Sequence, residues 1–93
     1  MLDEAWAIDP SVALRPEPFG ALAYHFGTRK LVFLKTPELV VVVEQLAGVG
    51  TVRNALVAAG VPEPSWPAYV SALASLAESK MIRPVGAGKG AAA

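Results

Sequence analysis

The stretch Leu31-Val32-Phe33-Leu34-Lys35-Thr36-Pro37-Glu38-Leu39 decides the fold, because the spacing of its apolar residues changes within it. Its first five side chains alternate between two faces, as in a β-strand. Thr36 is then a suitable helix N-cap, Pro37 suits the first helical position, and Glu38 complements the positive end of the helix dipole. The stretch therefore predicts a strand followed at once by a helix.

Two more strands are predicted before this stretch. Residues 12–15 alternate apolar and polar side chains until two prolines interrupt the pattern. Residues 21–26 alternate in the same way, and a turn over residues 27–30 leads into the strand at residues 31–35. On the middle strand one face is predicted to carry Leu22, Tyr24 and Phe26, and the other face Ala23 and His25. We therefore expect a three-stranded antiparallel meander.

Three helices are predicted after it. The first has apolar residues at helical spacing, with Gly48 as its expected stop. The second begins after the N-cap candidate Thr51 and stops at Gly60. The third begins after a cap at Ser65, carries a broad apolar stripe, and ends near Lys80.

The predicted fold class is α+β, with a three-stranded antiparallel sheet followed by three helices. This order is similar to that of winged-helix domains. Residues 1–85 are expected to form one domain, in which residues 82–85 add a short extended segment. Residues 86–93 are rich in Gly and Ala, lack side chains that could order them, and are expected to be a flexible tail.

Composition argues against several classes of function. Eight Lys and Arg balance eight Asp and Glu, so no net positive field exists to attract nucleic acid. The absence of cysteine excludes disulfides, thiolate metal sites and cysteine nucleophiles. No apolar run approaches the roughly 20 residues of a membrane span, and the acidic start does not resemble a signal peptide. We therefore expect a cytoplasmic protein that binds neither membrane nor nucleic acid.

Polar residues form no catalytic, metal or cofactor site in the sequence. His25 is the single histidine, and we expect it to have a half-exposed structural role, because a metal site needs further ligands. Arg29, Lys30 and Lys35 lie at the ends of the third strand. They could attract acidic residues of a bound segment, or they could simply be solvated and discourage edge pairing.

The open edge of the meander is the strongest candidate for a binding site. An outer strand exposes unpaired backbone groups, so an extended peptide could pair with residues 31–35 and place alternate side chains against the last helix. Leu73 and Leu76 are three residues apart on one stripe, and we expect only one of them to be fully buried. We assign Leu73 to the core and Leu76, with Tyr69 and Lys80, to the peptide side.

The block Val-Ala-Leu-Arg-Pro-Glu-Pro-Phe-Gly-Ala-Leu-Ala-Tyr-His-Phe-Gly-Thr at residues 12–28 closely resembles the small peptide chaperones of mycofactocin biosynthesis. The resemblance continues through residues 31–35 and covers the chain from about Trp6 to Val85. More distantly, the passage ending in Gly50-Thr51-Val52 is similar to the pyrroloquinoline-quinone peptide chaperone and to precursor-recognition domains of other peptide-modifying enzymes.

The resemblance implies a non-catalytic, winged-helix-like domain that binds the leader of a ribosomally made precursor peptide and delivers it to a radical S-adenosylmethionine maturase. The iron–sulfur cluster and S-adenosylmethionine would belong to that enzyme, consistent with the lack of cysteine here. The leader would pair with the third strand and lie against the last helix. The expected peptide-binding residues are Leu31, Val32, Phe33, Leu34, Lys35, Tyr69, Leu76 and Lys80.

Two other classes of function are weaker alternatives. A winged-helix DNA-binding domain would need basic residues on its recognition helix, yet the segment from Trp66 to Lys80 has one lysine and one glutamate. A small enzyme would need a nucleophile or an acid–base pair, and no such arrangement is recognisable. The sequence leaves open whether the domain is a monomer or dimerises through its free strand edge.

Overall fold

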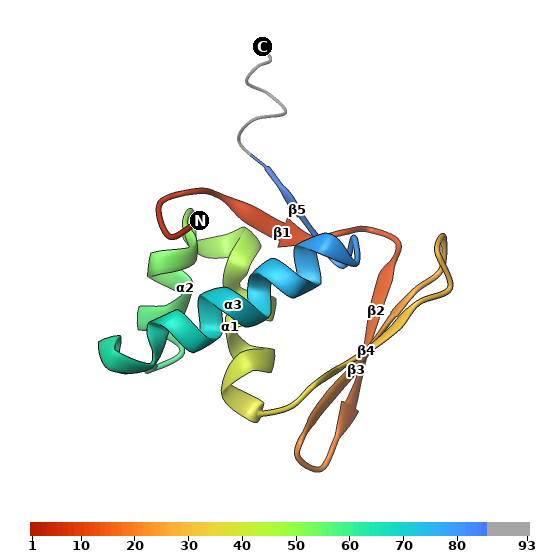
Figure 1. The fold of residues 1–93 in the computed structure, drawn as a ribbon, viewed down its shortest axis with the longest axis horizontal. Helices are drawn as coiled ribbons and strands as arrows, with labels where there is room; N and C mark the ends of the chain where they lie inside the picture. Colours follow the sequence, from red (N-terminus) through yellow and green to blue (C-terminus); the bar gives the residue numbers. More distant parts are fainter. Residues whose placement is uncertain (86–93) are drawn as a thin grey trace.

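The computed structural model of the 93-residue chain describes residues 1–85 (Figure 1). The described part is α+β, as predicted, and the predicted tail at residues 86–93 lies outside it. The elements in chain order are β1 (Trp6–Ile8), β2 (Val12–Glu17), β3 (Gly20–His25), β4 (Leu31–Leu34), α1 (Pro37–Val49), α2 (Val52–Ala58), a 3₁₀ turn (Glu63–Ser65), α3 (Trp66–Glu78) and β5 (Ile82–Pro84).

The predicted meander is confirmed, with strand order β2-β3-β4 and antiparallel pairing throughout. The face of β3 that packs toward the helices carries its small residues, Ala21 and Ala23, which are buried. The larger Leu22 and Tyr24 lie on the opposite face and are partly exposed. The predicted alternation is therefore correct, and the alanines are on its inner side.

Helix α1 begins where the sequence predicts it. The Thr36 hydroxyl oxygen accepts a hydrogen bond from the Leu39 N–H at 3.1 Å, and Pro37 occupies the first turn. Four consecutive valines would favour a strand, but packing of an apolar face outweighs intrinsic propensity. The buried residues of α1 are Leu39, Val42, Val43 and Leu46.

The end of α1 differs from the prediction. Gly48 lies inside the helix, and the left-handed residue that ends it is Gly50, with φ of 93°. Helix α2 starts as expected, because the Thr51 hydroxyl accepts from the Asn54 N–H at 3.2 Å. The first two N–H groups of α2 donate to the N-terminal segment. The N–H of Val52 donates to the Glu4 carbonyl, and that of Arg53 donates to the Leu2 carbonyl.

Helix α3 carries the predicted apolar stripe, but the expected side-chain cap at Ser65 is absent. A 3₁₀ turn leads into the helix instead. Trp66 lies in the core, and its indole N–H donates to the Val61 carbonyl at 2.9 Å. The helix ends at Glu78, two residues before Lys80 adopts a φ of 65°.

A second, two-stranded sheet joins the two ends of the described chain. The expected extended segment at residues 82–85 is present as β5, and it pairs antiparallel with β1, a strand that the sequence pattern did not predict. Ile8 lies opposite Ile82 in this sheet. Within residues 1–85, the helices are too short or too polar to cross a membrane.

Gly20 provides a test of the close approach of β3 to β4. A Cβ at Gly20 would collide with the backbone carbonyl of Leu34, which cannot move away as a flexible side chain could. We expect Gly20→Ala to lower the free energy of unfolding by about 1–3 kcal/mol. Urea unfolding followed by circular dichroism measures the change.

The matched control is Gly48→Ala on α1, where an added Cβ meets nothing within 4 Å. This change should stabilise the domain by about 0.5–1 kcal/mol, because alanine favours the helix more than glycine does. Equal effects of the two substitutions would contradict the close approach of β3 and β4 at Gly20.

Candidate functional site

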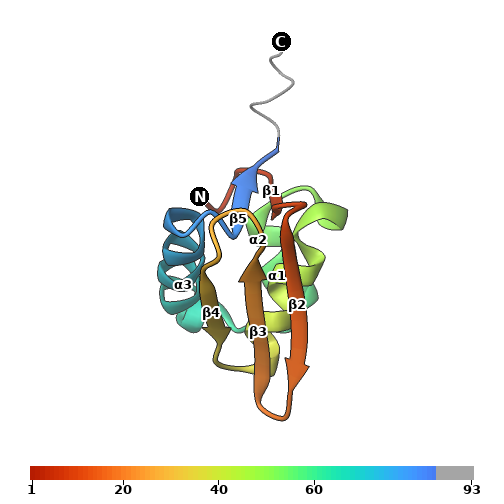
Figure 2. The same ribbon diagram turned by 90° about the vertical axis from the view of Figure 1, so that its right-hand side faces the viewer.

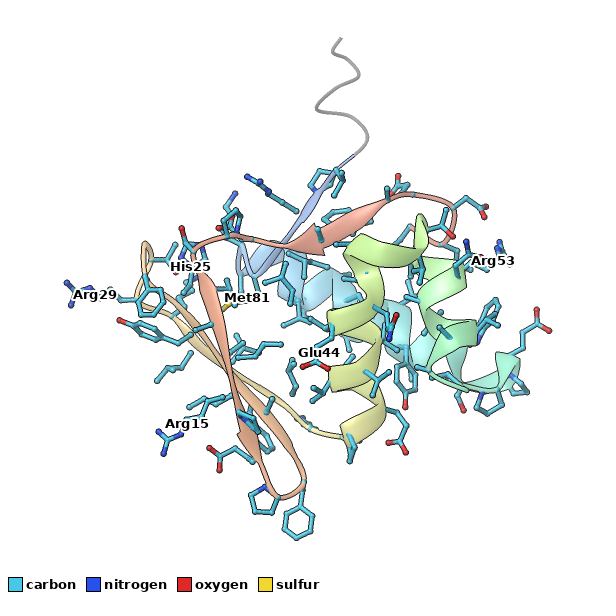
Figure 3. The ribbon with its side chains drawn as sticks, turned by 180° about the vertical axis from the view of Figure 1, so that it is seen from behind. Arg15, His25, Arg29, Glu44, Arg53 and Met81 are labelled. Atoms are coloured by element: carbon cyan, nitrogen blue, oxygen red, sulfur yellow. The ribbon has the colours of Figure 1, made fainter. Side chains whose placement is uncertain are left out.

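His25 holds the loop between β3 and β4 rather than forming a reactive site (Figure 3). The residue is 7% exposed, so the expectation of a half-exposed histidine is wrong. Its Nδ1 atom accepts from the backbone N–H groups of Gly27 and Thr28 at 3.0 and 3.1 Å. Since Nδ1 is an acceptor, the ring proton lies on Nε2, which faces Asp9 Oδ1 at 3.9 Å. The structural role itself agrees with the prediction.

Asp9 and Asp3 take part in local structure. The Ser11 N–H donates to Asp9 at 2.8 Å and lowers the pKa of that carboxyl group. Arg53 donates to Asp3 at 3.0 Å, lowers the pKa of Asp3, and also lies 5.6 Å from the centre of the Trp66 ring. The contacts of Arg53 fasten the N-terminal segment to α2 and α2 to the start of α3. An open hollow of about 670 Å³ lies beside them.

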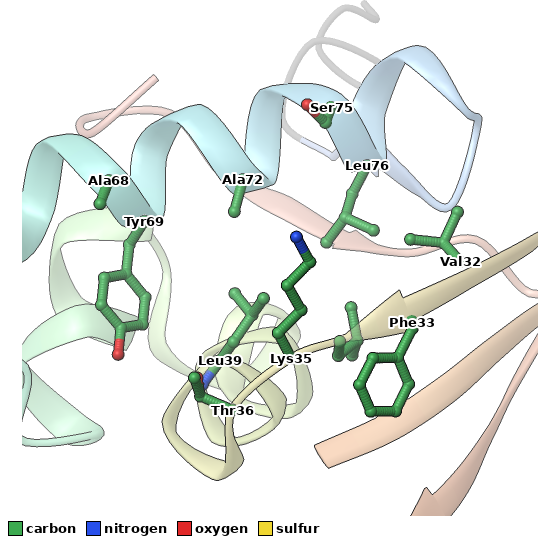
Figure 4. Close-up of a pocket in the computed structure, with 11 residues that line it drawn as sticks. Val32, Phe33, Lys35, Thr36, Leu39, Ala68, Tyr69, Ala72, Ser75 and Leu76 are labelled. Atoms are coloured by element: carbon green, nitrogen blue, oxygen red, sulfur yellow. The ribbon is translucent and has the colours of Figure 1, made fainter. Parts of the chain in front are cut away.

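The candidate binding site is a groove between β4 and α3, with a volume of about 440 Å³ (Figure 4). Strand β4 lies at the edge of the meander and pairs with β3 alone among the described strands. Helix α3 runs beside it on the side away from β3 (Figure 2). The eleven lining residues are Val32, Phe33, Leu34, Lys35, Thr36, Leu39, Ala68, Tyr69, Ala72, Ser75 and Leu76.

The groove has an apolar floor and a more polar mouth. Leu34, Leu39 and Leu76 are almost fully buried by the protein and still line the groove, so they form its base. Tyr69 is half-buried, and Lys35 is exposed and extends toward α3 (Figure 4). Sites of this kind combine apolar burial with a few polar groups that orient the ligand.

The backbone of β4 presents hydrogen-bonding groups at the same place. The His25 N–H donates to the Lys30 carbonyl at 3.0 Å, and hydrogen-bonded pairs alternate with non-hydrogen-bonded pairs along an antiparallel ladder. The His25–Lys30 pair is hydrogen-bonded, so the pairs that contain Leu31 and Phe33 are non-hydrogen-bonded. The N–H and C=O groups of Leu31 and Phe33 therefore point away from β3. The open edge therefore offers two donors and two acceptors to an added strand.

The structure places six of the eight expected peptide-binding residues around this groove. These six are Val32, Phe33, Leu34, Lys35, Tyr69 and Leu76. Leu31 and Lys80 do not line it, although the backbone of Leu31 belongs to the same open edge. The part that all eight residues play in peptide binding stays a prediction.

The expectation that Leu73 and Leu76 could not both be buried is wrong. Leu73 is 0% exposed, as its assignment to the core requires, and Leu76 is 3% exposed. Leu76 nevertheless reaches the groove, because a side chain can be shielded from solvent by its neighbours and still form the floor of a depression.

Five groove residues were missed by sequence reasoning: Thr36, Leu39, Ala68, Ala72 and Ser75. The three on α3 are small and recur at intervals of four and three residues, so they share one helix face. Small side chains on a face that borders the strand leave room for a ligand, and this spacing was readable from the sequence. Thr36 was assigned only to the helix cap, and Leu39 was given no part in the site.

The described residues do not favour the alternative functions. Residues 1–85 contain no group of three His, Cys, Asp or Glu side chains that could hold a metal ion. Helix α3 contains neither lysine nor arginine, whereas a helix that reads DNA needs such residues to contact phosphates and base edges.

The chain is similar to peptide chaperones. The model of the Peptide chaperone MftB family matches residues 5–83. The Peptide chaperone MftB of Mycobacterium tuberculosis is 50% identical over 82 residues, which cover 88% of this chain and 75% of the relative. That of Mycolicibacterium smegmatis is 51% identical over 82 residues, covering 88% and 80%. No solved structure matches the chain, so the winged-helix likeness stays a prediction.

Two leucine substitutions on α3 separate the core from the groove. Leu73→Ala and Leu76→Ala should each lower the free energy of unfolding by about 2–5 kcal/mol, because both remove buried side chains. Only Leu76→Ala should also change the affinity for a bound peptide, because Leu73 does not line the groove.

Urea unfolding gives the stability of each variant, and calorimetric titration gives its affinity after correction for the unfolded fraction. Equal corrected affinities for the two variants would show that the floor of the groove does not contact the ligand.

Proposed function

The chain belongs to the peptide chaperone MftB family, whose role is non-catalytic, and we propose that it binds the leader of a ribosomally made precursor peptide. In this proposal it presents the leader to a radical S-adenosylmethionine maturase of mycofactocin biosynthesis. The observation that carries the proposal is the open edge of β4 facing α3 across an apolar groove. The proposed domain comprises residues 1–85, and the proposed location is the cytoplasm.

The proposed mode of binding is addition of a strand. The leader would lie along β4 and form main-chain hydrogen bonds with Leu31 and Phe33, whose backbone groups face the open edge. Alternate leader side chains would enter the groove and rest on Leu34 and Leu76. Main-chain bonds would supply much of the affinity, and the groove would supply the specificity.

The groove also favours a certain leader chemistry. Its floor is apolar, so we expect apolar leader residues at alternate positions. Lys35 is exposed at the mouth and has no ion-pair partner among residues 1–85. We therefore expect an acidic leader residue near Lys35, where the charge would fix the register of the strand more than it raises the affinity.

In this proposal the chemistry belongs to the enzyme. The chaperone holds the leader while the rest of the precursor stays free to enter the active site of the maturase. Binding the peptide and the enzyme together raises the effective concentration of substrate without any new catalytic group. The chain alone should therefore leave the precursor unmodified.

The direct test of strand addition is Phe33→Pro. Proline removes the N–H that faces the open edge but leaves the ladder with β3 intact, and edge strands tolerate proline for this reason. We expect the leader affinity to fall at least about tenfold, since the added strand loses a main-chain bond and meets the proline ring. Calorimetric titration measures the affinity.

Phe33→Ala is the matched control, because it removes the same side chain and keeps the N–H. Val32→Pro should instead unfold the meander, since the Val32–Ala23 pair is hydrogen-bonded in this register. If Phe33→Pro remains folded by circular dichroism and binds the leader as well as Phe33→Ala, the leader does not pair with β4.

Delivery is tested by filling the groove. Ala72→Leu places a larger side chain on the groove wall, whereas Ala74→Leu makes the same change at an exposed site of α3 that does not line the groove. Alanine and leucine are both good helix formers, so both variants should keep their unfolding midpoint. Purified maturase, precursor and each variant are then combined, and product is followed by mass spectrometry.

We expect Ala72→Leu to slow product formation at least about tenfold at limiting chaperone, through loss of leader binding, and Ala74→Leu to have no effect. Product made at equal rates with Ala72→Leu and wild type, or made as fast with the chaperone omitted, would refute delivery through this groove.

A further inference from the structure

The face of the meander that points away from the helices is largely apolar. Phe26, Leu31 and Phe33 are 62%, 59% and 47% exposed, and Leu22 and Tyr24 are partly exposed beside them. The register places Tyr24 opposite Leu31 and Leu22 opposite Phe33, so these side chains are neighbours. Figure 2 looks onto this face, and none of the described helices covers it.

Contacts among the residues of this face do not explain why exposed positions carry apolar side chains. The rings of Tyr24 and Phe26, which are two residues apart along the chain, meet edge to face with centroids 4.9 Å apart, and such an aromatic pair stabilises the sheet locally. Polar residues could fill the same positions while leaving the buried face unchanged. A contiguous exposed patch of aromatic and aliphatic residues on a small domain is typical of a protein interaction surface.

The charges around the patch indicate the kind of partner. The meander and its loops, residues 12–35, contain four basic residues and a single acidic one, Glu17. Arg15 and Arg29 project away from the helices near the two ends of the sheet (Figure 3). A protein surface with an apolar centre and acidic residues around it would complement this face. A second copy of the chain would bring two basic faces together, which opposes self-association.

We propose that this outer face, formed by Leu22, Tyr24, Phe26, Leu31 and Phe33 with Arg15 at its rim, is the docking surface for the enzyme that receives the peptide. The proposal rests on the proposed function. It identifies the contact by its chemistry: the enzyme contributes an apolar patch bordered by carboxylates. The leader groove and the docking face share strand β4, and Phe33 belongs to both.

The shared strand couples the two binding events. A leader added to β4 would become a fourth strand, and its side chains that point away from the groove would extend the outer face beyond Leu31 and Phe33. The enzyme would then contact chaperone and leader together and bind the loaded chaperone more tightly than the empty one. Thermodynamic linkage requires the enzyme to raise the affinity for the leader by the same factor.

Tyr24→Glu tests the docking face without changing the groove. Tyr24 is on β3 and does not line the groove, and a carboxylate at its position would repel an acidic partner. Val57→Glu is the matched control, since Val57 is an exposed apolar residue on α2, away from the meander. Arg15→Glu is a second variant at a largely exposed side chain, so it should fold even if Tyr24→Glu does not.

Leader affinity is measured by calorimetric titration, and enzyme affinity by surface plasmon resonance with and without leader. We expect Tyr24→Glu and Arg15→Glu to keep the leader affinity of the wild type and to weaken enzyme binding at least about tenfold. Val57→Glu should change neither affinity. For the wild type, leader should tighten enzyme binding by the same factor as enzyme tightens leader binding.

Wild-type enzyme binding by folded Tyr24→Glu and Arg15→Glu would overturn the docking face and leave the proposed function intact. Failure of the wild-type chain to bind leader or enzyme would instead overturn the proposed function. Sedimentation velocity completes the test: a concentration-dependent dimer that Tyr24→Glu abolishes would assign the face to a second copy and overturn the proposal.

Discussion

The close packing of α1 on the alanine face of β3 is the constraint on which the rest of the structure depends. Ala21 and Ala23 are small enough for the helix to approach the sheet, and Val42, Val43 and Leu46 fill the space between them. Because small residues occupy the inner face, the larger residues of β3 lie on the outer one. Strand β4 is at the edge of the meander, and α3 lies beside it without pairing with it.

An open strand edge is a liability in a small protein, and the structure limits it in several ways. Strand β4 has only four residues, which shortens the template that another chain could pair with. Lys30 and Lys35 border it, and like charges at the ends of identical strands oppose edge-to-edge pairing. Helix α3 lies alongside, so an incoming strand must also fit the groove. The edge is therefore accessible to a matching peptide and poorly suited to indiscriminate pairing.

Much of the fold was predictable because its signals are local. The meander and the strand-to-helix change at Thr36 follow from side-chain alternation and capping chemistry, and both are present. Alternation cannot say which face is inward, since that is decided by the helix that packs there. The pairing of β1 with β5 was missed because three-residue strands show no usable period and their partners are far apart in sequence. In the groove, residues with large side chains on β4 were predicted, whereas Ala68 and Ala72 contribute by the room they leave.

The pairing of β1 with β5 has a consequence for how the domain can be attached to other proteins. The first and last strands of the described chain are antiparallel neighbours, and neither strand contributes a lining residue to the groove. Folded units whose ends lie together can be inserted into loops of other proteins or fused to them at either end without distortion. The same recognition unit could thus work as a separate partner or as a covalent module of an enzyme, with its peptide groove unobstructed in both arrangements.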